Sequence, residues 1–244
     1  MTWLSIDSSY KGKVAGANRA LTSLQSIAGR QLNAVAKTGG ASHMAFINGG
    51  FFNWQSTTDR RLPESSPIGA AVIDSKTVHS VAIPEVHARD YHKLLMADLS
   101  YIHSAPMLAF QGIASFTEDH LNHSRFIFSR GTNVPGNLGH ADQRNTRSAI
   151  SQPASGTDGR TRLVVGSSKG RGPEGTGYTM AEWADAVARI DRMNADPGRS
   201  LNLDGGASSV LGVVNKAGEV LLRFGDYSNP DRSIGNFLAF ARRG

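Results

Sequence analysis

The chain has 244 residues, no cysteine and a formal net charge of +6. The lack of cysteine excludes disulfide bridges and thiolate metal sites, and no apolar run reaches the roughly 18 residues of a membrane-spanning helix, so no membrane span is expected. The positive charge favours anionic partners, but the basic residues are scattered and no zinc-finger or helix-turn-helix pattern accompanies them, so no specific nucleic-acid partner is expected.

The first part of the chain predicts an amphipathic helix. The opening residues lack the basic start and long apolar stretch of a secretory signal, so the localisation stays open between the cytoplasm and export by another route. Apolar residues recur at three-to-four spacing over residues 17–37, and Gly39 and Gly40 end the pattern. Residues 1–44 are therefore expected to form an N-terminal helical extension of a single domain spanning residues 1–244.

Residues 44–54 (MAFINGGFFNW) predict a strand that ends in a polar residue and a glycine pair. Asn48 closes the strand, and Gly49 and Gly50 follow it. Glycines lack the Cβ atom that would crowd a ligand and permit backbone angles closed to other residues. The next residues are aromatic and could form an apolar wall against a sugar: Phe51, Phe52 and Trp54. One of the two phenylalanines is expected to belong to the core instead.

The middle of the chain predicts short strands separated by loops. The polar residues 55–67 include two prolines and predict a loop at the rim of the aromatic group. A hairpin-like turn is expected at residues 74–77, and a helix at residues 90–98. Strands are expected at residues 68–73, 78–83, 107–110, 125–128, 147–151 and 162–166.

A glycine-rich segment and a capped helix come next. Residues 166–177 contain five glycines and predict a mobile segment at the rim of a cleft. Thr179 and Glu182 have the spacing of a capping box at a helix start. The helix is expected to end at residues 196–198 and to bury Met180, Trp183, Ala184, Val187 and Ile190.

Residues 200–210 (SLNLDGGASSV) repeat the pattern of the first glycine pair. Apolar and polar residues alternate as in a half-buried strand, and Asp204 then precedes Gly205 and Gly206. A carboxylate at a strand end, beside backbone amides and the Ser208 hydroxyl, suits a sugar or phosphate site. The alternative is a tight turn in which Asp204 bonds its own backbone. A hairpin is expected at residues 210–214 and 219–224, and a last strand at residues 233–241.

These elements predict a mixed α/β (α+β) fold: a single layered domain with mixed β-sheets and two to three packed helices. The hairpins exclude a purely parallel sheet.

Five segments, in this order, resemble the phosphodiester glycosidase family: residues 47–52 (INGGFF), 147–150 (RSAI), 177–182 (GYTMAE), 202–209 (NLDGGASS) and 232–236 (RSIGN). The resemblance runs from about residue 45 to residue 240. The family usually has a third glycine where this chain has Ala207, and Arg-Thr-Ala-Ile-Gly where residues 147–151 read RSAIS. The resemblance implies that the two glycine pairs meet at one cleft. It also implies that the protein hydrolyses the bond between a sugar's anomeric carbon and a phosphate oxygen.

Candidate site residues follow from this chemistry. Asp204 is the candidate nucleophile or general base, and Asn48 is expected to hold a sugar hydroxyl or to orient that carboxylate. Arg147 and Arg232 are phosphate candidates, because a guanidinium can donate two parallel hydrogen bonds to a phosphate. Further substrate contacts are expected from Gly49, Gly50, Phe51, Gly205, Gly206 and Ser208. Candidates for a partner carboxylate are Glu64, Asp142 and Glu182, the last of which is better assigned to its capping box.

No metal or other cofactor is expected. His120 and His123 have a helical spacing, but no third zinc ligand is evident nearby. Calcium bound by carboxylates and carbonyls is compatible with the sequence, although no loop has the EF-hand pattern.

Three functions remain open at this point. The first is hydrolysis of a glycosyl phosphodiester or an anionic glycopolymer, such as one from a bacterial or phage-associated cell envelope. The second is a non-catalytic carbohydrate- or glycopolymer-binding module, and the third is a phosphodiesterase that cleaves P–O. The sugar, the stereochemical course and the oligomeric state stay undetermined by the sequence.

Overall fold

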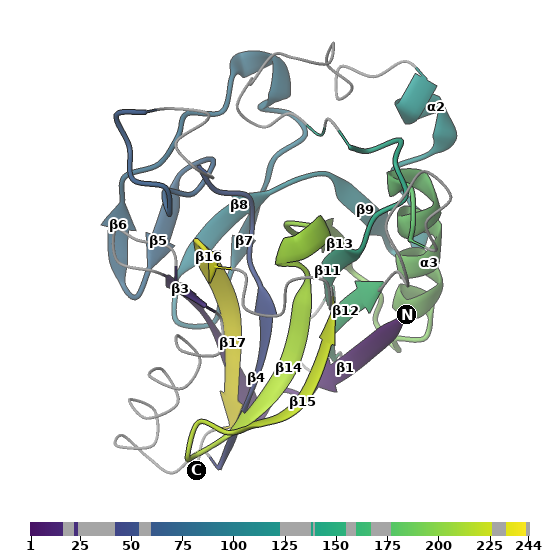
Figure 1. Cartoon of the computed structure of the whole chain (residues 1–244). Helices are drawn as coiled ribbons and strands as arrows, with labels where there is room; N and C mark the ends of the chain where they lie inside the picture. The colour runs from purple at the N-terminus through teal and green to yellow at the C-terminus, as the bar shows by residue number, and fades with distance from the viewer. Residues whose placement is uncertain are drawn as a thin grey trace.

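Two packed antiparallel sheets form the centre of the protein, shown by a computed structural model (Figure 1). The structure describes residues 1–16, 22–23, 42–53, 60–122, 138, 140–154, 160–166, 177–225 and 233–242.

The first sheet has six strands, with helix α3 on one face (Figure 1). Its strands, in spatial order, are β1 (Thr2–Ile6), β12 (Thr161–Gly166), β11 (Arg147–Gln152), β13 (Arg199–Asn202), β9 (Met107–Phe110) and β10 (Ile113–Ala114). Helix α3 (Met180–Arg192) begins at the predicted capping box: Glu182 N donates to Thr179 Oγ1 at 3.2 Å, and Thr179 N donates to Glu182 Oε2 at 3.0 Å. All five apolar residues predicted to be buried in this helix are buried.

The second sheet has five strands and packs against the first. Its strands, in spatial order, are β15 (Val220–Gly225), β14 (Val210–Asn215), β4 (His43–Asn48), β17 (Asn236–Arg242) and β2 (Tyr10–Gly16). One apolar cluster joins side chains of both sheets, including Ile150 and Leu201 from the first and Ile47 and Leu238 from the second. Strand β4 lies in the middle of its sheet and is buried from Met44 onward. Asn48, at the end of β4, is therefore held in place by the core.

Two smaller sheets and three short helical segments complete the described fold. The four-stranded sheet runs in the order β6 (Lys76–Val78), β5 (Ala71–Ile73), β8 (Tyr101–Ser104), β7 (His92–Leu95), and the two-stranded one pairs β16 (Ser233–Ile234) with β3 (Thr22–Ser23). The helical segments are η2 (Glu85–His87), α2 (Glu118–Asn122) and η3 (Gly206–Ser208).

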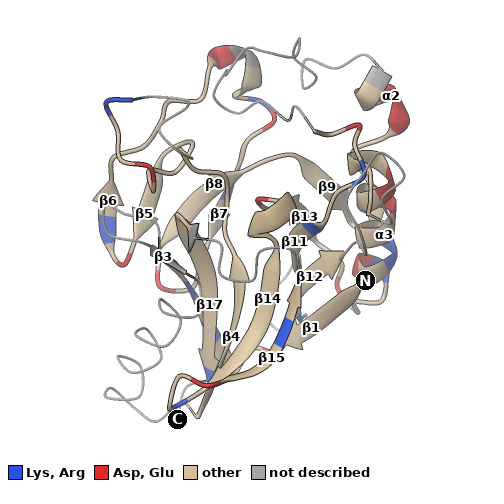
Figure 2. Cartoon of the chain, in the orientation of Figure 1, with Lys and Arg blue, Asp and Glu red and all other residues tan. Residues whose placement is uncertain are grey.

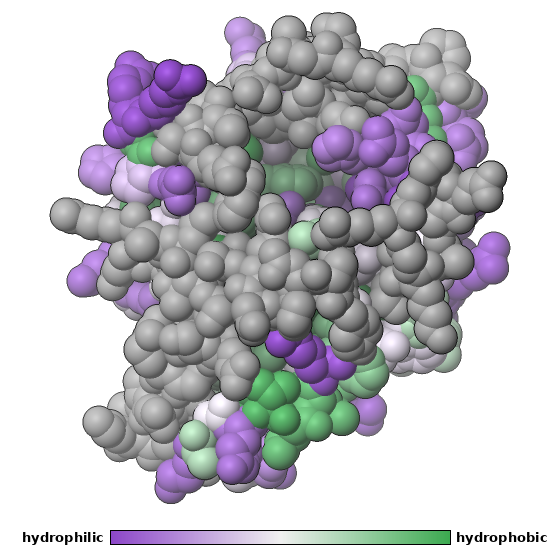
Figure 3. Space-filling view, viewed as in Figure 1, coloured by the Kyte–Doolittle hydropathy of each residue, from purple (hydrophilic) through white to green (hydrophobic). Residues whose placement is uncertain are grey.

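The described surface has mixed charge, and an apolar area is visible near its lower end. Figure 2 shows acidic and basic residues interspersed along the described ribbon. In Figure 3, an apolar area lies over β14 and β15, where Leu221 and Leu222 are close to half exposed. No described helix is long and apolar enough to cross a membrane.

The α+β prediction is confirmed in its coarse form, with sheets dominating the fold. The expected mixed sheets are not found among the described strands, because every ladder between them is antiparallel; Ile68 and Val81 form an isolated parallel bridge. The helical connection from β12 through α3 to β13 passes over β11, so the two parallel strands that it joins are not neighbours.

One local prediction is wrong, and another, the hairpin, is confirmed with different bounds. The helix expected at residues 90–98 is strand β7, in which Leu94 is fully buried and its neighbour Leu95 is exposed, as strand geometry requires. The expected hairpin turn is tighter than residues 74–77. Asp74 and Ser75 have φ values of 48° and 62°, the left-handed conformation of a two-residue hairpin turn, so β6 already begins at Lys76.

The N-terminal segment also differs from its prediction. Residues 1–16 form β1 and β2, which pair with β12 and β17, so they are part of the two main sheets. Within the predicted helix 17–37 the structure describes residues 22–23, which form strand β3, and the rest of that helix lies outside the described residues.

Most predicted strands are confirmed. They include the expected strands at 107–110, 147–151, 162–166, 210–214 and 219–224. The last strand is divided at Gly235 into β16 and β17. The predicted strand at 125–128 and the mobile segment predicted between Gly166 and Gly177 lie outside the described residues.

Candidate active site

The two glycine-pair turns meet, although 156 positions separate Asn48 from Asp204. Strand β4 ends at Asn48 in one sheet, and β13 leads into Asp204 from the other. Asp204 N donates to Gly49 O at 2.9 Å, and Asn48 Nδ2 donates to Asp204 O at 2.8 Å. Two backbone segments far apart in the sequence are thus joined directly beneath the site.

Asn48 is buried within this junction. Its side chain is 1% exposed, and its Oδ1 accepts from Val210 N at 3.0 Å. One carboxamide therefore bridges the residue before the second glycine pair and the first residue of β14. The side chain lies behind the site, where it fixes the backbone on which Asp204 stands.

Asn236 secures the first turn from the opposite side. Its main-chain oxygen accepts from Gly49 N at 3.0 Å, and its Nδ2 donates to Gly50 O at 3.3 Å. A Cβ atom at Gly49 would lie 1.9 Å from Asn236 Oδ1, and one at Gly50 would lie 2.8 Å from His103 O. Close packing therefore requires both glycines. The role of Asn236 was not predicted, although the residue closes the last segment of the family resemblance.

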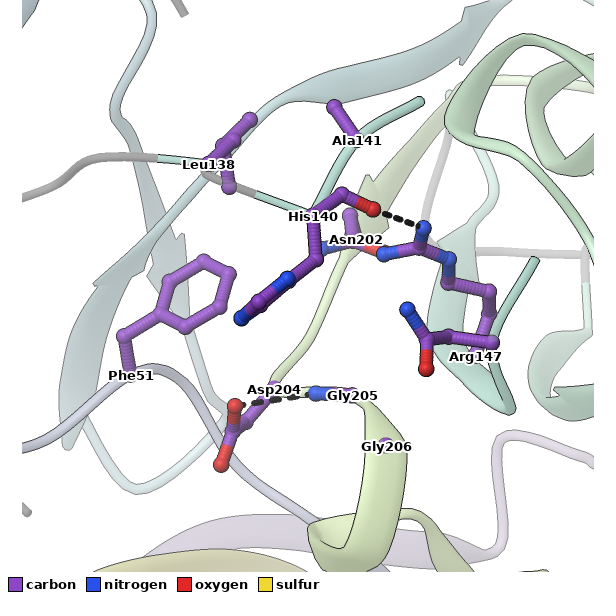
Figure 4. A pocket seen from close by; sticks show the side chains of 10 residues that line it. Phe51, Leu138, His140, Ala141, Arg147, Asn202, Asp204, Gly205 and Gly206 are labelled. Carbon is purple, nitrogen blue, oxygen red and sulfur yellow. Dashed lines mark hydrogen bonds between the residues drawn. The ribbon is translucent and has the colours of Figure 1, made fainter. Parts of the chain in front are cut away.

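A cavity of about 140 Å³ opens above the second turn (Figure 4). We call it the Asp204 pocket; it is lined by Phe51, Leu138, His140, Ala141, Asn145, Arg147, Asn202, Asp204, Gly205 and Gly206. A protein cavity of about 150 Å³ can hold benzene, so the Asp204 pocket is large enough for one six-membered ring.

Asp204 is the carboxylate among the described lining residues of this pocket. Figure 4 shows its carboxylate beside Gly205, away from the Arg147 guanidinium. Its Oδ1 accepts from Gly205 N at 2.9 Å, so the carboxylate also stabilises its own turn. The turn interpretation and the site interpretation of Asp204 therefore both have a structural basis, and its side chain is only partly buried.

Arg147 also lines the pocket, but most of its donors are engaged. Its Nη2 donates to His140 O at 2.6 Å and to Gln143 O at 2.8 Å, and its Nε donates to Tyr178 O at 3.1 Å. Burial lowers the pKa of Arg147 to about 10, opposed by the nearby Asp142 carboxylate. The guanidinium stays protonated at neutral pH. To donate two parallel hydrogen bonds to a phosphate, the guanidinium would have to give up its hydrogen bond to one of these carbonyls.

The remaining predicted residues divide into three groups. Phe51 lines the Asp204 pocket, whereas Phe52 is 8% exposed and belongs to the core. Ser208 is 3% exposed in η3 and does not line the pocket. Arg232 and Trp54 lie outside the described residues.

The three candidates for a partner carboxylate lie elsewhere. Glu64 and Asp142 are exposed and are not among the lining residues. Glu182 belongs to its capping box and pairs with Arg144 Nη2.

Sequence reasoning missed several lining residues. His140 and Ala141 fall between the strands predicted at residues 125–128 and 147–151, where no helix or strand was predicted. Asn202 lies in the second glycine-pair motif, which was a usable signal. Its Nδ2 donates to Ala105 O at 3.0 Å and to Leu203 O at 2.7 Å, and its buried Oδ1 accepts no hydrogen bond from the described residues.

Tyr91 lies next to Phe51, the phenylalanine that lines the pocket. Its ring centroid is 6.5 Å from that of Phe51, and its hydroxyl is buried without a partner among the described residues. Burial, with a smaller contribution from the Asp204 charge, raises the pKa of Tyr91, so the hydroxyl stays protonated at neutral pH.

The described residues contain no group of three His, Cys, Asp or Glu side chains that could hold a metal ion. His120, one of the two histidines with zinc-ligand spacing, instead accepts from Thr117 N through Nδ1 at 3.1 Å. His123 lies outside the described part of the chain.

A model of the phosphodiester glycosidase family matches residues 41–241. The chain belongs to this family. No curated protein sequence matches it. Among solved structures, it resembles a hypothetical protein from Synechocystis at 15% identity and a TM-score of 0.53, covering 98% of this chain and 59% of that one. The chain therefore spans little more than half of that protein.

A second similar structure is the zebrafish N-acetylglucosamine-1-phosphodiester alpha-N-acetylglucosaminidase catalytic domain, auto-inhibited by its pro-peptide. It is 15% identical with a TM-score of 0.50, over 96% of this chain and 73% of that one. At this identity the likeness shows a shared fold.

Proposed function

We propose that the protein is a hydrolase that cleaves the anomeric C–O bond of a glycosyl phosphodiester and releases a sugar and a phosphomonoester. One observation carries the proposal beyond family membership. The Asp204 pocket, with a volume of about 140 Å³, combines a carboxylate with a buried arginine and an aromatic side chain. Such a lining supplies an apolar surface with a few polar groups that orient a ligand.

Asp204 would act at the anomeric carbon. It either attacks this carbon to form a glycosyl ester, which water then hydrolyses, or it takes a proton from a water that attacks directly. In both courses the C–O bond breaks with its electron pair on the phosphate oxygen. A phosphomonoester has a second pKa of about 6, so it leaves far more readily than an alkoxide.

The other residues would support this reaction in different ways. Asn48 would hold the Asp204 backbone, since its carboxamide is used for that purpose in the structure. The positive charge of Arg147 at the pocket would favour an anionic substrate. Phe51 would face the sugar, and Gly205 and Gly206 line the same space without side chains that would fill it.

Hydrolysis in heavy-oxygen water tests the bond that is broken. The protein is incubated with α- and β-glycosyl phosphodiesters, and the products are examined by mass spectrometry. We expect the label in the sugar, which means C–O cleavage. A label in the phosphate would mean P–O cleavage and would establish the phosphodiesterase alternative. The anomer of the first sugar product, followed by proton NMR, then decides between retention and inversion.

A carbohydrate-binding module without activity is the second candidate. It is favoured by the finding that Asp204 is the sole carboxylate among the described lining residues, whereas most glycosidases use two. Calorimetric binding of sugars or anionic glycans, together with no turnover across both anomeric series, would establish it.

A further inference from the structure

His140 is the histidine among the described lining residues of the Asp204 pocket. Figure 4 shows its ring directed into the space between Phe51 and Asp204. The residue is exposed, so a ligand in the pocket can reach the ring. Histidine is the side chain most often used to move protons in enzymes.

The orientation of this ring is fixed by a neighbour in the same turn. His140 Nδ1 lies 3.1 Å from Gln143 Oε1. A carboxamide oxygen can only accept, so this arrangement is compatible with Nδ1–H as the donor. Nε2 is then the atom left for a ligand, and it donates a hydrogen bond when the imidazole is protonated.

Arg147 holds the turn that carries this ring. Its Nη2 binds the carbonyls of both His140 and Gln143, which are the two ends of the turn. The turn is also attached to the start of α3, because Met180 N donates to Ala141 O at 2.8 Å. Arg147 is only 6% exposed, so its position is set by these contacts. The observed use of this guanidinium is to place His140.

We propose that His140 is a catalytic residue that contacts the substrate phosphate through Nε2, and that Arg147 is a positioning residue that acts through it. The proposal rests on the proposed function. As the anomeric C–O bond breaks, its electron pair goes to the phosphate oxygen, and protonated His140 transfers the Nε2 proton there. When Asp204 is the base, the water that adds to the anomeric carbon gives one proton to Asp204, and solvent water carries that proton back to His140 after the products leave. When Asp204 is the nucleophile, neutral His140 takes a proton from the water that hydrolyses the glycosyl ester, and Asp204 is released as the carboxylate.

Binding of inorganic phosphate is the first test, because it does not require turnover. The imidazole carbon–proton NMR signals of His140 should shift on addition of phosphate. His140→Ala should weaken phosphate binding about 10- to 100-fold, the range for a hydrogen bond to a charged group. His43→Ala is the matched control and should bind as the parent does, since His43 is exposed at the far end of β4 and bonds Ser42. Equal affinity of His140→Ala and the parent would overturn the proposal.

The role of Arg147 needs variants that separate positioning from folding. Arg147→Lys keeps the charge, but one ammonium cannot hold both ends of the turn, so the His140 signals of the free protein should move and phosphate affinity should fall. Gln143→Leu leaves the carbonyl contacts of Arg147 in place and removes only the partner of Nδ1. It should lower phosphate affinity several-fold with an unchanged unfolding midpoint. It tests the orientation of the His140 ring independently of Arg147. Parent-like His140 signals and affinity in the folded variants would exclude the positioning role.

Turnover separates this proposal from the proposed function. If the parent cleaves a glycosyl phosphodiester and His140→Ala is equally active, the catalytic role of His140 is excluded and the proposed function stands. If the parent cleaves none in a broad panel but binds phosphate through His140, the proposed function fails and the phosphate contact stands.

Discussion

The two glycine-pair turns have nearly the same sequence pattern, but their polar residues differ in burial. In the first turn the side chain of Asn48 is 1% exposed and is used to hold backbone. In the second, Asp204 is only partly buried and lines a cavity. The two residues differ in their position relative to the strand: Asn48 is the last residue of β4, whereas Asp204 lies two residues beyond β13. A shared pattern therefore does not give a shared environment, and of the two polar side chains the less buried one lines a cavity.

The glycines of the two turns differ in the same way. Added Cβ atoms at Gly49 and Gly50 would collide with neighbouring residues, whereas one at Gly205 would approach Thr146 O only to 3.3 Å. At Gly206 nothing lies within 4 Å, but φ is +59°. The first pair is required by packing. In the second pair, Gly206 is required by its backbone conformation and leaves open space for a ligand.

The largest effect is expected at Asp204, the less buried of the two polar side chains. Asp204→Asn should lower turnover of a cleaved substrate by roughly 10³-fold or more, because a carboxamide is neither a nucleophile nor an effective base. Its oxygen can still accept from Gly205 N, so the fold should persist. Steady-state kinetics and circular dichroism check both parts. Asp185→Asn, an exposed change on α3, is the control, and near-parent turnover of Asp204→Asn would make Asp204 a turn residue.

A change at Asn48, the buried polar side chain, should lower the stability of the fold. Asn48→Ala leaves Val210 N and Asp204 O without their partner, which should cost about 2–4 kcal/mol in the free energy of unfolding. Asn48→Asp keeps the acceptor for Val210 N and should isolate the lost donor. Urea unfolding measures both. A stable Asn48→Ala variant with impaired substrate binding would show that Asn48 contacts the substrate directly, and the contrast between the turns would fail.

A smaller loss of stability is expected at the packed glycine. Gly49→Ala places a methyl group against Asn236 Oδ1 and should cost about 1–3 kcal/mol, the usual range for overpacking. The cost should be smaller when Asn236 is already alanine, and a double-mutant cycle by urea unfolding measures the difference. Additive effects of the two changes would mean that the clash is relieved elsewhere.

The smallest effect is expected at the open glycine. Gly206→Ala should cost about 1–2 kcal/mol for a left-handed conformation, with no clash. Gly206→Asn should cost less, since asparagine tolerates that conformation. Thermal unfolding compares the two. A loss as large as that of Gly49→Ala would show that the neighbourhood of Gly206 is tighter than the structure gives.

Local signals predicted much of this fold. The capping box of α3 and the strands on either side of it were readable, because each depends on residues close together in the sequence. Strand β7 was missed, since only its pairing with β8 decides that residues 92–95 are extended. Strands β1 and β2 were missed for the same reason: their partners lie more than a hundred residues away.

The site shows the same limit. Residues in glycine-pair motifs could be found from their local pattern, and Asp204 and Phe51 do line the pocket. Contacts to main-chain atoms could not, because a main-chain atom leaves no residue pattern. No pattern indicates that Arg147 binds the carbonyls of residues 140 and 143, although they are near in the sequence, or that the distant Asn236 holds Gly49.

Because β4 lies between β14 and β17, its sheet can form only after most of the chain has been synthesised. Asn48 is translated early, yet both neighbours of its strand come from the last quarter of the sequence, and Leu238 pairs directly with Ile47. While the ribosome is still adding residues, β4 exposes an apolar strand with open edges, the kind of segment that aggregates or recruits chaperones. The yield of soluble protein therefore depends on how quickly β17, which is synthesised last, pairs with β4.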